Sequence, residues 1–194
     1  MTDKNWGVIE RMLDKITADC MEKALYNGLK NALKGKTIII QFTNKNYASF
    51  TFNGTSAVEL RLTAESNELF HEMWHTYQAY QENKSTFLNS LINQEIEAHY
   101  AQYLYLQKLP EYKNNKWEKY YSNDQRMATI KNLKQYINEK GHLHSNADIN
   151  AFNSHFLITV SIFEITPGYH NYKYDETRTG LINFSNLRIL TKDC

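Results

Sequence analysis

Residues 58–75 of this chain have the sequence V-E-L-R-L-T-A-E-S-N-E-L-F-H-E-M-W-H. The first five alternate apolar and charged side chains, a period of two that predicts a half-buried β-strand. Thr63 or Ser66 can cap a helix that follows, and the glutamates at its start favour the positive end of the helix dipole. The sequence therefore predicts a strand followed directly by a helix that extends to about Gln81.

The predicted helix carries the motif H-E-x-x-H. His71 and His75 are four residues apart, about one helical turn, so both imidazoles lie on one face. Two neutral imidazoles placed in this way can bind a divalent metal ion, most often zinc. Glu72 follows the first histidine, where its carboxylate can take a proton from a water beside the metal. The alternative is a solvated helix face that carries these residues by chance.

A second helix, predicted for residues 86–109 and ended by Pro110, can supply a third ligand. A hydrolytic zinc site needs three protein ligands and an open position. Glu95 lies twenty residues after His75, and its rival Glu97 points about 200° around the helix from it. Only one of the two glutamates can face the site, and we predict Glu95.

The spacing resembles that of a gluzincin metallopeptidase, in which H-E-x-x-H supplies two zinc ligands and a later E-x-x-A helix supplies the third. The match covers residues 56–106, about a quarter of the chain, with Ala98 as the small residue. It implies a zincin-like α+β fold, with a small mixed sheet packed on the motif helix and a mostly helical C-terminal half. It also implies peptide-bond hydrolysis by metal-activated water, with Glu72 as the base and Zn2+ held by three residues: His71, His75 and Glu95.

One position departs from this pattern. Many gluzincins have Asp four residues after the glutamate ligand, where it hydrogen-bonds a zinc histidine. This chain has His99 there, so the hydrogen-bonding partner comes from elsewhere or His99 has a different task. Gln78, one turn after His75, either borders the site or packs beside it.

Hydrolysis also needs a donor for the oxyanion of the tetrahedral intermediate. In gluzincins a His or Tyr from a distal segment often provides it, and Tyr169 and His170 are our candidates here, with Tyr172 as a further one. His142 and His144 are weaker metal candidates, because histidines at a helix end also favour the dipole. If the strand at residues 58–62 borders the cleft, as in zincins, it would bind an extended peptide by strand addition.

Periodicity places the remaining elements. It predicts a helix over residues 9–33, a central strand over residues 37–42 and another strand over residues 48–52. Asn53-Gly54 would form the turn into the strand before the motif helix. Further helices are predicted for residues 112–140 and 147–164.

Composition sets the outer limits. A length of 194 residues fits a single domain, residues 1–194. A net charge of +1 and a pI near 7.7 give no electrostatic case for nucleic acid or an anionic membrane, and no apolar run is long enough to span a bilayer. No leader is visible, so a cytoplasmic location is the default expectation, with secretion the alternative if a leader has been removed. Two cysteines give neither a disulfide framework nor a Cys-rich metal site.

The sequence thus predicts a zinc metallopeptidase that acts on a peptide or protein. The alternatives are a zincin-like module that binds metal without turnover, a toxin-like effector peptidase, and a helical interaction protein without metal. Neither substrate preference nor oligomeric state follows from the sequence.

Overall fold

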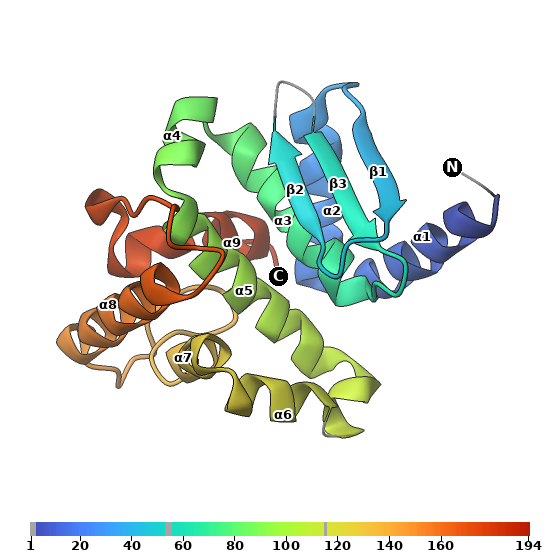
Figure 1. Ribbon diagram of the computed structural model, residues 1–194. Coiled ribbons are helices and arrows are strands. Elements are labelled where there is room, and N and C mark those ends of the chain that lie inside the picture. Colours follow the sequence, from blue (N-terminus) through green and yellow to red (C-terminus); the bar gives the residue numbers. More distant parts are fainter. Residues whose placement is uncertain (1–2, 53–55, 115) are drawn as a thin grey trace. The chain divides into compact units, whose positions relative to one another are not determined.

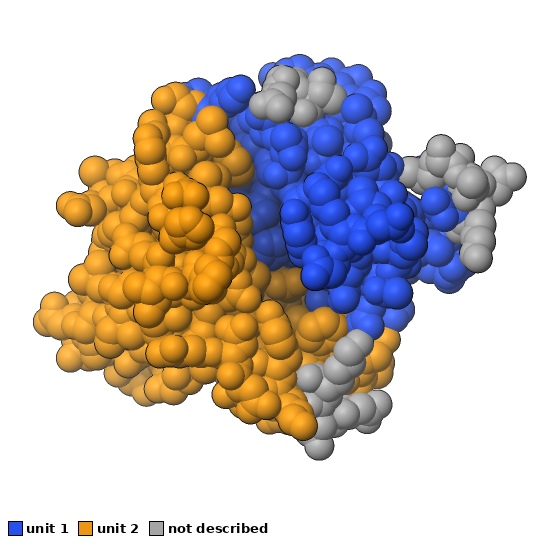
Figure 2. Space-filling model, in the orientation of Figure 1, with its two compact units in different colours: residues 1–84, 194 blue, residues 85–193 orange. Residues whose placement is uncertain are grey.

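The computed structural model describes residues 3–52, 56–114 and 116–194. The described residues form helices and one small mixed sheet, and the half after residue 85 is helical, so the predicted α+β class is confirmed. They group into two compact units, which Figure 2 shows in different colours. Unit 1 contains residues 1–84 and 194, and unit 2 contains residues 85–193. That residues 1–194 form a single domain stays a prediction.

The sheet of unit 1 has three strands in the order β1–β3–β2 (Figure 1). β3 (Ser56–Arg61) lies in the middle, parallel to β1 (Ile38–Thr43) and antiparallel to β2 (Ser49–Phe52). The predicted alternation is confirmed at Val58 and Leu60, which are buried.

Two details of the predicted sheet are wrong. Leu62 lies past the end of β3 and is 65% exposed. The expected roles of two strands are also reversed, because β3 has neighbours on both sides and β1 is at an edge. The predicted turn at residues 53 and 54 lies outside the described residues.

Three helices complete unit 1: α1 (Asp3–Ile16), α2 (Cys20–Leu33) and α3 (Ser66–Gln81). Both α1 and α2 pack on α3, and α3 packs on β2 and β3, behind the sheet in Figure 1. The prediction of a single helix over residues 9–33 is wrong, because the structure has two helices there. The second begins after Asp19, whose carboxylate accepts a hydrogen bond from the Cys20 N–H at the start of α2.

The cysteines form a disulfide that the composition did not suggest. Cys20 bonds to Cys194 across 174 residues, with a Cα–Cα distance of 5.8 Å. Both cysteines belong to unit 1, so the disulfide lies within that unit.

The motif helix α3 is fixed at its start by a reciprocal cap. The Glu65 side chain accepts from the backbone of the third helical residue, Glu68, and the Glu68 side chain accepts from the Glu65 N–H at 2.9 Å. Arg61, at the end of β3, donates to the other Glu68 oxygen at 2.7 Å. The cap is therefore Glu65, and not Thr63 or Ser66 as predicted, and it couples strand to helix.

Unit 2 is built around α5 (Leu91–Lys108), which is buried along most of its length and packs against α7 and α8. The other helices in this part of the chain are α4 (Lys84–Asn89), α6 (Lys116–Asn123), α7 (Gln125–Leu133), α8 (Ile149–Ile165) and α9 (Ser185–Thr191). Short 3-10 segments cover Pro110–Asn114 (η1), Glu176–Arg178 (η2) and Gly180–Phe184 (η3). No helix in the described parts of the chain has the length and apolarity needed to cross a bilayer.

Two helices that were predicted as continuous are interrupted in the structure. The helix expected over residues 86–109 is broken at Ser90, whose hydroxyl donates to the Thr86 carbonyl at 2.8 Å. The helix expected over residues 112–140 is also wrong, because Asp124 caps α7 by accepting from the Met127 N–H at 3.1 Å. The helix predicted for residues 147–164 is confirmed as α8.

Candidate metal centre

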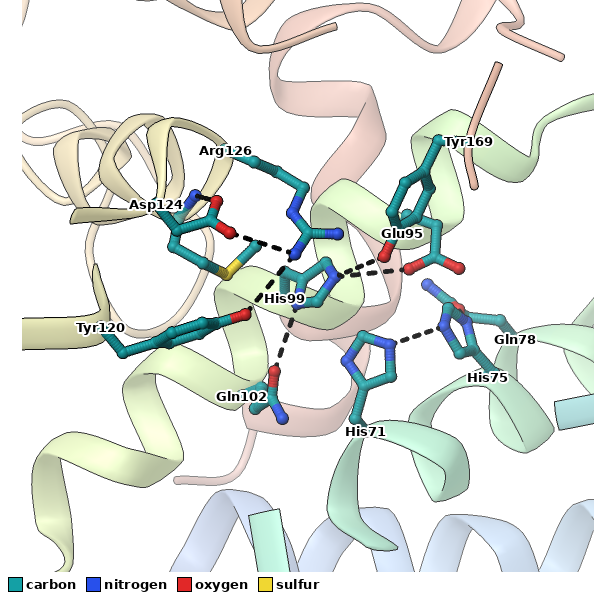
Figure 3. A network of polar contacts seen from close by, with 11 residues as sticks. His71, His75, Gln78, Glu95, His99, Gln102, Tyr120, Asp124, Arg126 and Tyr169 are labelled. Atoms are coloured by element: carbon teal, nitrogen blue, oxygen red, sulfur yellow. Dashed lines mark hydrogen bonds and ion pairs between the residues drawn. The ribbon is translucent and has the colours of Figure 1, made fainter. Parts of the chain in front are cut away.

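In unit 1, the two motif histidines point their rings toward each other on one face of α3 (Figure 3). The Nε2 atoms of His71 and His75 are 2.9 Å apart. The other ring nitrogen of His75, Nδ1, lies 2.9 Å from the Gln78 side-chain oxygen. Both imidazoles are largely buried, so their orientation is set by packing as well as by hydrogen bonding.

Gln78 determines which nitrogen of His75 is available. An amide oxygen can only accept, so the His75 Nδ1 carries the hydrogen and its Nε2 presents a lone pair toward His71. Two tetrahedral zinc ligands at ordinary bond lengths have their nitrogens about 3.3 Å apart. The observed 2.9 Å is within a few tenths of an ångström of that separation, so the pair fits a metal ion after a small ring movement.

The surroundings of the pair in unit 1 are apolar and aromatic. Phe50 of β2 stacks on the His75 ring, with 6.3 Å between ring centroids, and Trp74 is fully buried on α3. Glu72 is buried beside them, with 5% of its surface exposed. A carboxylate in such surroundings is shielded from bulk water, which is the environment a general base requires.

Unit 2 contributes a second polar cluster, on α5 and the turn after α8 (Figure 3). His99 Nε2 lies 3.5 Å from a Glu95 carboxylate oxygen and 3.4 Å from the Tyr169 hydroxyl. His99 Nδ1 lies 3.2 Å from the Gln102 side-chain oxygen. Glu95, His99 and Tyr169 therefore converge on one point within unit 2.

The contacts of His99 fit two arrangements of its ring hydrogen. With the hydrogen on Nδ1 toward Gln102, the lone pair of Nε2 can accept from the Tyr169 hydroxyl or bind a cation shared with the Glu95 carboxylate. A proton on Nε2 as well would attract the Glu95 carboxylate directly. An imidazole and a carboxylate are donors that several divalent metal ions accept, zinc among them.

Glu97 has a different role. Its side chain is fully buried and accepts from the Asn186 amide at 2.8 Å and from the Leu187 N–H at 3.0 Å. The carboxylate thus lies against the start of α9, where the helix dipole favours a negative charge. Glu97 therefore faces a neighbouring element and not solvent, while metal binding by Glu95 stays a prediction.

Tyr169 lies against a residue that the sequence did not single out, Arg126 of α7. The guanidinium lies over the Tyr169 ring, 4.9 Å from its centroid. Burial, reinforced by the charge of Glu95 and opposed by that of Arg126, raises the pKa of the Tyr169 hydroxyl well above its ordinary value. Tyr169 therefore keeps its proton at neutral pH and can act as a hydrogen-bond donor.

The remaining candidates lie apart from this cluster or at the surface of unit 2. His170 follows Tyr169 in the turn and is exposed, while Tyr172 packs edge-to-face on the Tyr169 ring. His144 Nε2 lies 3.1 Å from the Lys134 carbonyl and ties down the loop after α7. His142 is exposed in the same loop, and its carbonyl accepts from the Asn138 N–H.

Of two further residues that contact the candidate site residues, sequence reasoning named Gln78 and missed Arg126. Gln78 has a visible signal, since it lies one turn after a motif histidine. Arg126 has none, because an arginine in the middle of a polar stretch predicted to be helical is typical of a solvated surface. Comparisons with models of protein families, with curated proteins and with solved structures found no match to this chain.

Proposed function

We propose that this protein is a zincin-like, zinc-dependent peptidase. One observation carries the proposal: the Nε2 atoms of His71 and His75 converge to 2.9 Å while Gln78 holds the outer nitrogen of His75. A histidine oriented by a hydrogen bond to its non-ligating nitrogen is the usual form of a metal ligand. The chain has Gln78 in this role where many gluzincins use an aspartate on the later helix.

Glu95 is the proposed third ligand. Its rival Glu97 accepts hydrogen bonds from Asn186 and Leu187 against α9, which favours Glu95 as the carboxylate of α5 that binds a metal. One alternative ligand set uses His71, Glu95 and His99 and leaves His75 beside the ion. Both sets require His71 and Glu95, and a metal-affinity measurement on His75→Ala and His99→Ala distinguishes them.

Bound zinc would supply Lewis acidity, which makes water more acidic and polarises a peptide carbonyl. Glu72 would take the proton of the attacking water and pass it to the leaving amine, as a buried carboxylate next to a ligand can. Tyr169 would donate its hydroxyl hydrogen to the oxyanion, since its raised pKa keeps it protonated. His99 would orient that hydroxyl by donating an Nε2 hydrogen to its oxygen, which leaves the hydroxyl hydrogen for the oxyanion.

The structure corrects the strand expected to bind substrate. β3 is paired on both sides and cannot accept another strand, whereas β2 has a partner on one side only among the described strands. β2 also carries Phe50, which stacks on His75. We therefore propose that an extended peptide pairs with the free edge of β2, through main-chain hydrogen bonds and next to the metal ligands.

Glu72→Gln tests the proposal, because the amide keeps the shape of the side chain but cannot act as a base at neutral pH. We expect zinc to be retained and hydrolysis of an unfolded protein substrate to fall at least about a hundredfold. Glu68→Gln is a matched control, since Glu68 lies on the same helix, where it caps the helix start and accepts from Arg61. Wild-type rates in zinc-loaded Glu72→Gln would refute the mechanism, and a zinc-loaded wild-type protein without turnover would favour an inactive zincin-like module.

A further inference from the structure

The Arg126 side chain is 15% exposed, yet its charge is weakly paired. Two polar contacts of the guanidinium, to Asp124 and to the Tyr120 hydroxyl, both use Nη2 and both measure 3.5 Å, the outer limit for a hydrogen bond. The Nε atom is buried and has no hydrogen-bond partner among the described residues. A buried cation with such partners is costly unless a ligand completes its hydrogen bonds.

Asp124 does not fully neutralise Arg126. One carboxylate oxygen of Asp124 accepts from the Met127 N–H and caps α7, and the other makes the long contact to Arg126. The Asp124 side chain is also one-third exposed, so water weakens the ion pair. Because Asp124 also caps α7, it accepts only one long contact from the guanidinium, and the Arg126 Nε–H has no acceptor among the described residues.

Aromatic rings cover the face of the guanidinium. Its central carbon lies 4.9 Å from the Tyr169 ring centroid and 5.8 Å from that of Phe163, both within the range of a cation–π contact. A planar group held by its face presents the N–H bonds at its edge. The two-pronged edge of an arginine matches a carboxylate, which accepts two parallel hydrogen bonds.

From this arrangement we infer that Arg126 binds a carboxylate of the peptide substrate, and so sets which peptides are cut. The inference rests on the proposed peptidase function, since Arg126 lies against Tyr169, the proposed oxyanion donor. Glu95 also acts electrostatically on Arg126, and binding of the Glu95 charge to a metal would leave Arg126 in greater need of an anion. The carboxylate belongs either to the C-terminus of the peptide or to an Asp or Glu side chain.

Peptide binding to the Glu72→Gln protein tests the inference without turnover. The probes are fluorescein-labelled peptides of one sequence: one with a free C-terminal carboxylate, one with a C-terminal amide, and amidated versions with a single Glu at successive positions. We expect the carboxylate-bearing peptide to bind about tenfold or more tightly than the neutral one. Preference for the free C-terminus indicates a carboxypeptidase, and preference for an internal Glu indicates an acidic specificity pocket.

Substitution of the arginine then assigns the preference. In Arg126→Gln, the affinity for the carboxylate-bearing peptide should be within about twofold of that for the neutral peptide. Arg126→Lys keeps the charge but loses the planar fork, so its preference should lie between those of the parent protein and Arg126→Gln. Arg61→Gln is the control, because Arg61 is paired with Glu68 at 2.7 Å and should leave the preference unchanged. Circular dichroism and urea unfolding show whether the variants fold. If Arg126→Gln does not fold, Arg126→Lys still tests the inference.

Two outcomes overturn the inference: a carboxylate preference that survives in Arg126→Gln, or no carboxylate preference in the parent protein, including no binding of any probe. These outcomes differ from failure of the proposed function. A preference that depends on Arg126 in a protein without hydrolytic activity would refute the peptidase and leave the carboxylate site. Hydrolysis that depends on Glu72 without any carboxylate preference would support the peptidase and refute the carboxylate site.

Discussion

Glu95 and Glu97 are two residues apart on α5, and we predict that their removal has opposite consequences. Glu97→Ala should destabilise the fold and leave zinc affinity within a few-fold of wild type. Glu95→Ala should weaken zinc binding strongly, because it removes the anionic ligand, and should cost little stability. The contrast follows from their partners, since Glu97 holds the start of α9 and Glu95 faces His99.

The cost of Glu97→Ala can be worked from its hydrogen bonds. The substitution leaves the Leu187 N–H and the Asn186 amide without this acceptor in a fully buried site. An unsatisfied buried donor costs about 1–3 kcal/mol, so two of them cost about 3 kcal/mol after partial relaxation. With a urea dependence of about 2 kcal/mol per molar, the unfolding midpoint should fall by about 1.5 M.

Urea unfolding followed by circular dichroism gives the stability, and competition with a fluorescent chelator gives the zinc affinity. Glu111→Ala, which removes an exposed glutamate just after α5, is the control and should change neither quantity. The reasoning is refuted if Glu97→Ala shifts the midpoint by less than about 0.3 M. It is equally refuted if Glu97→Ala, and not Glu95→Ala, abolishes zinc binding.

Two further predictions concern the support of the site and the disulfide. Gln78→Leu, which keeps the packing volume but cannot accept from the His75 Nδ1, should weaken zinc binding about 10–100-fold by chelator competition, and an unchanged affinity would show that Gln78 only packs. Cys20→Ser and Cys194→Ser should each lower the free energy of unfolding by about 3–5 kcal/mol, because the bond closes a loop of 174 residues, and the double variant should cost no more than either single one. A double variant twice as destabilised would show that the cysteines act separately.

Local patterns in the sequence predicted the parts of unit 1 that carry the motif. The alternation around Val58 and Leu60 and the one-turn spacing of His71 and His75 are properties of a few adjacent residues, and the structure has them as predicted. The signals for helix breaks are also local, but the apolar periodicity on either side of them led to the prediction of continuous helices. Asp19 and Asp124 are cap-forming residues inside runs that were interpreted as continuous helices.

Long-range contacts could not be predicted in the same way. The order of the strands depends on the parallel pairing of β1 with β3, although β2 lies between them in the sequence. The side-chain pattern of a single strand does not indicate which strands will pair with it. Arg126 and Tyr169 meet across 43 positions of sequence, and neither residue type at its own position signals the other. The disulfide likewise pairs two cysteines whose spacing matches no known framework.

Zinc content is the measurement that tests the central claim most directly. We predict one zinc ion per chain by elemental analysis of protein prepared without added metal or chelator, bound by two imidazoles and a carboxylate. The His71→Ala and His75→Ala variants should lose high-affinity binding, while His144→Ala, which removes a histidine from the loop after α7, should keep it. A full equivalent of zinc in both motif variants, or a wild-type protein that binds no zinc when titrated with it, would contradict the account.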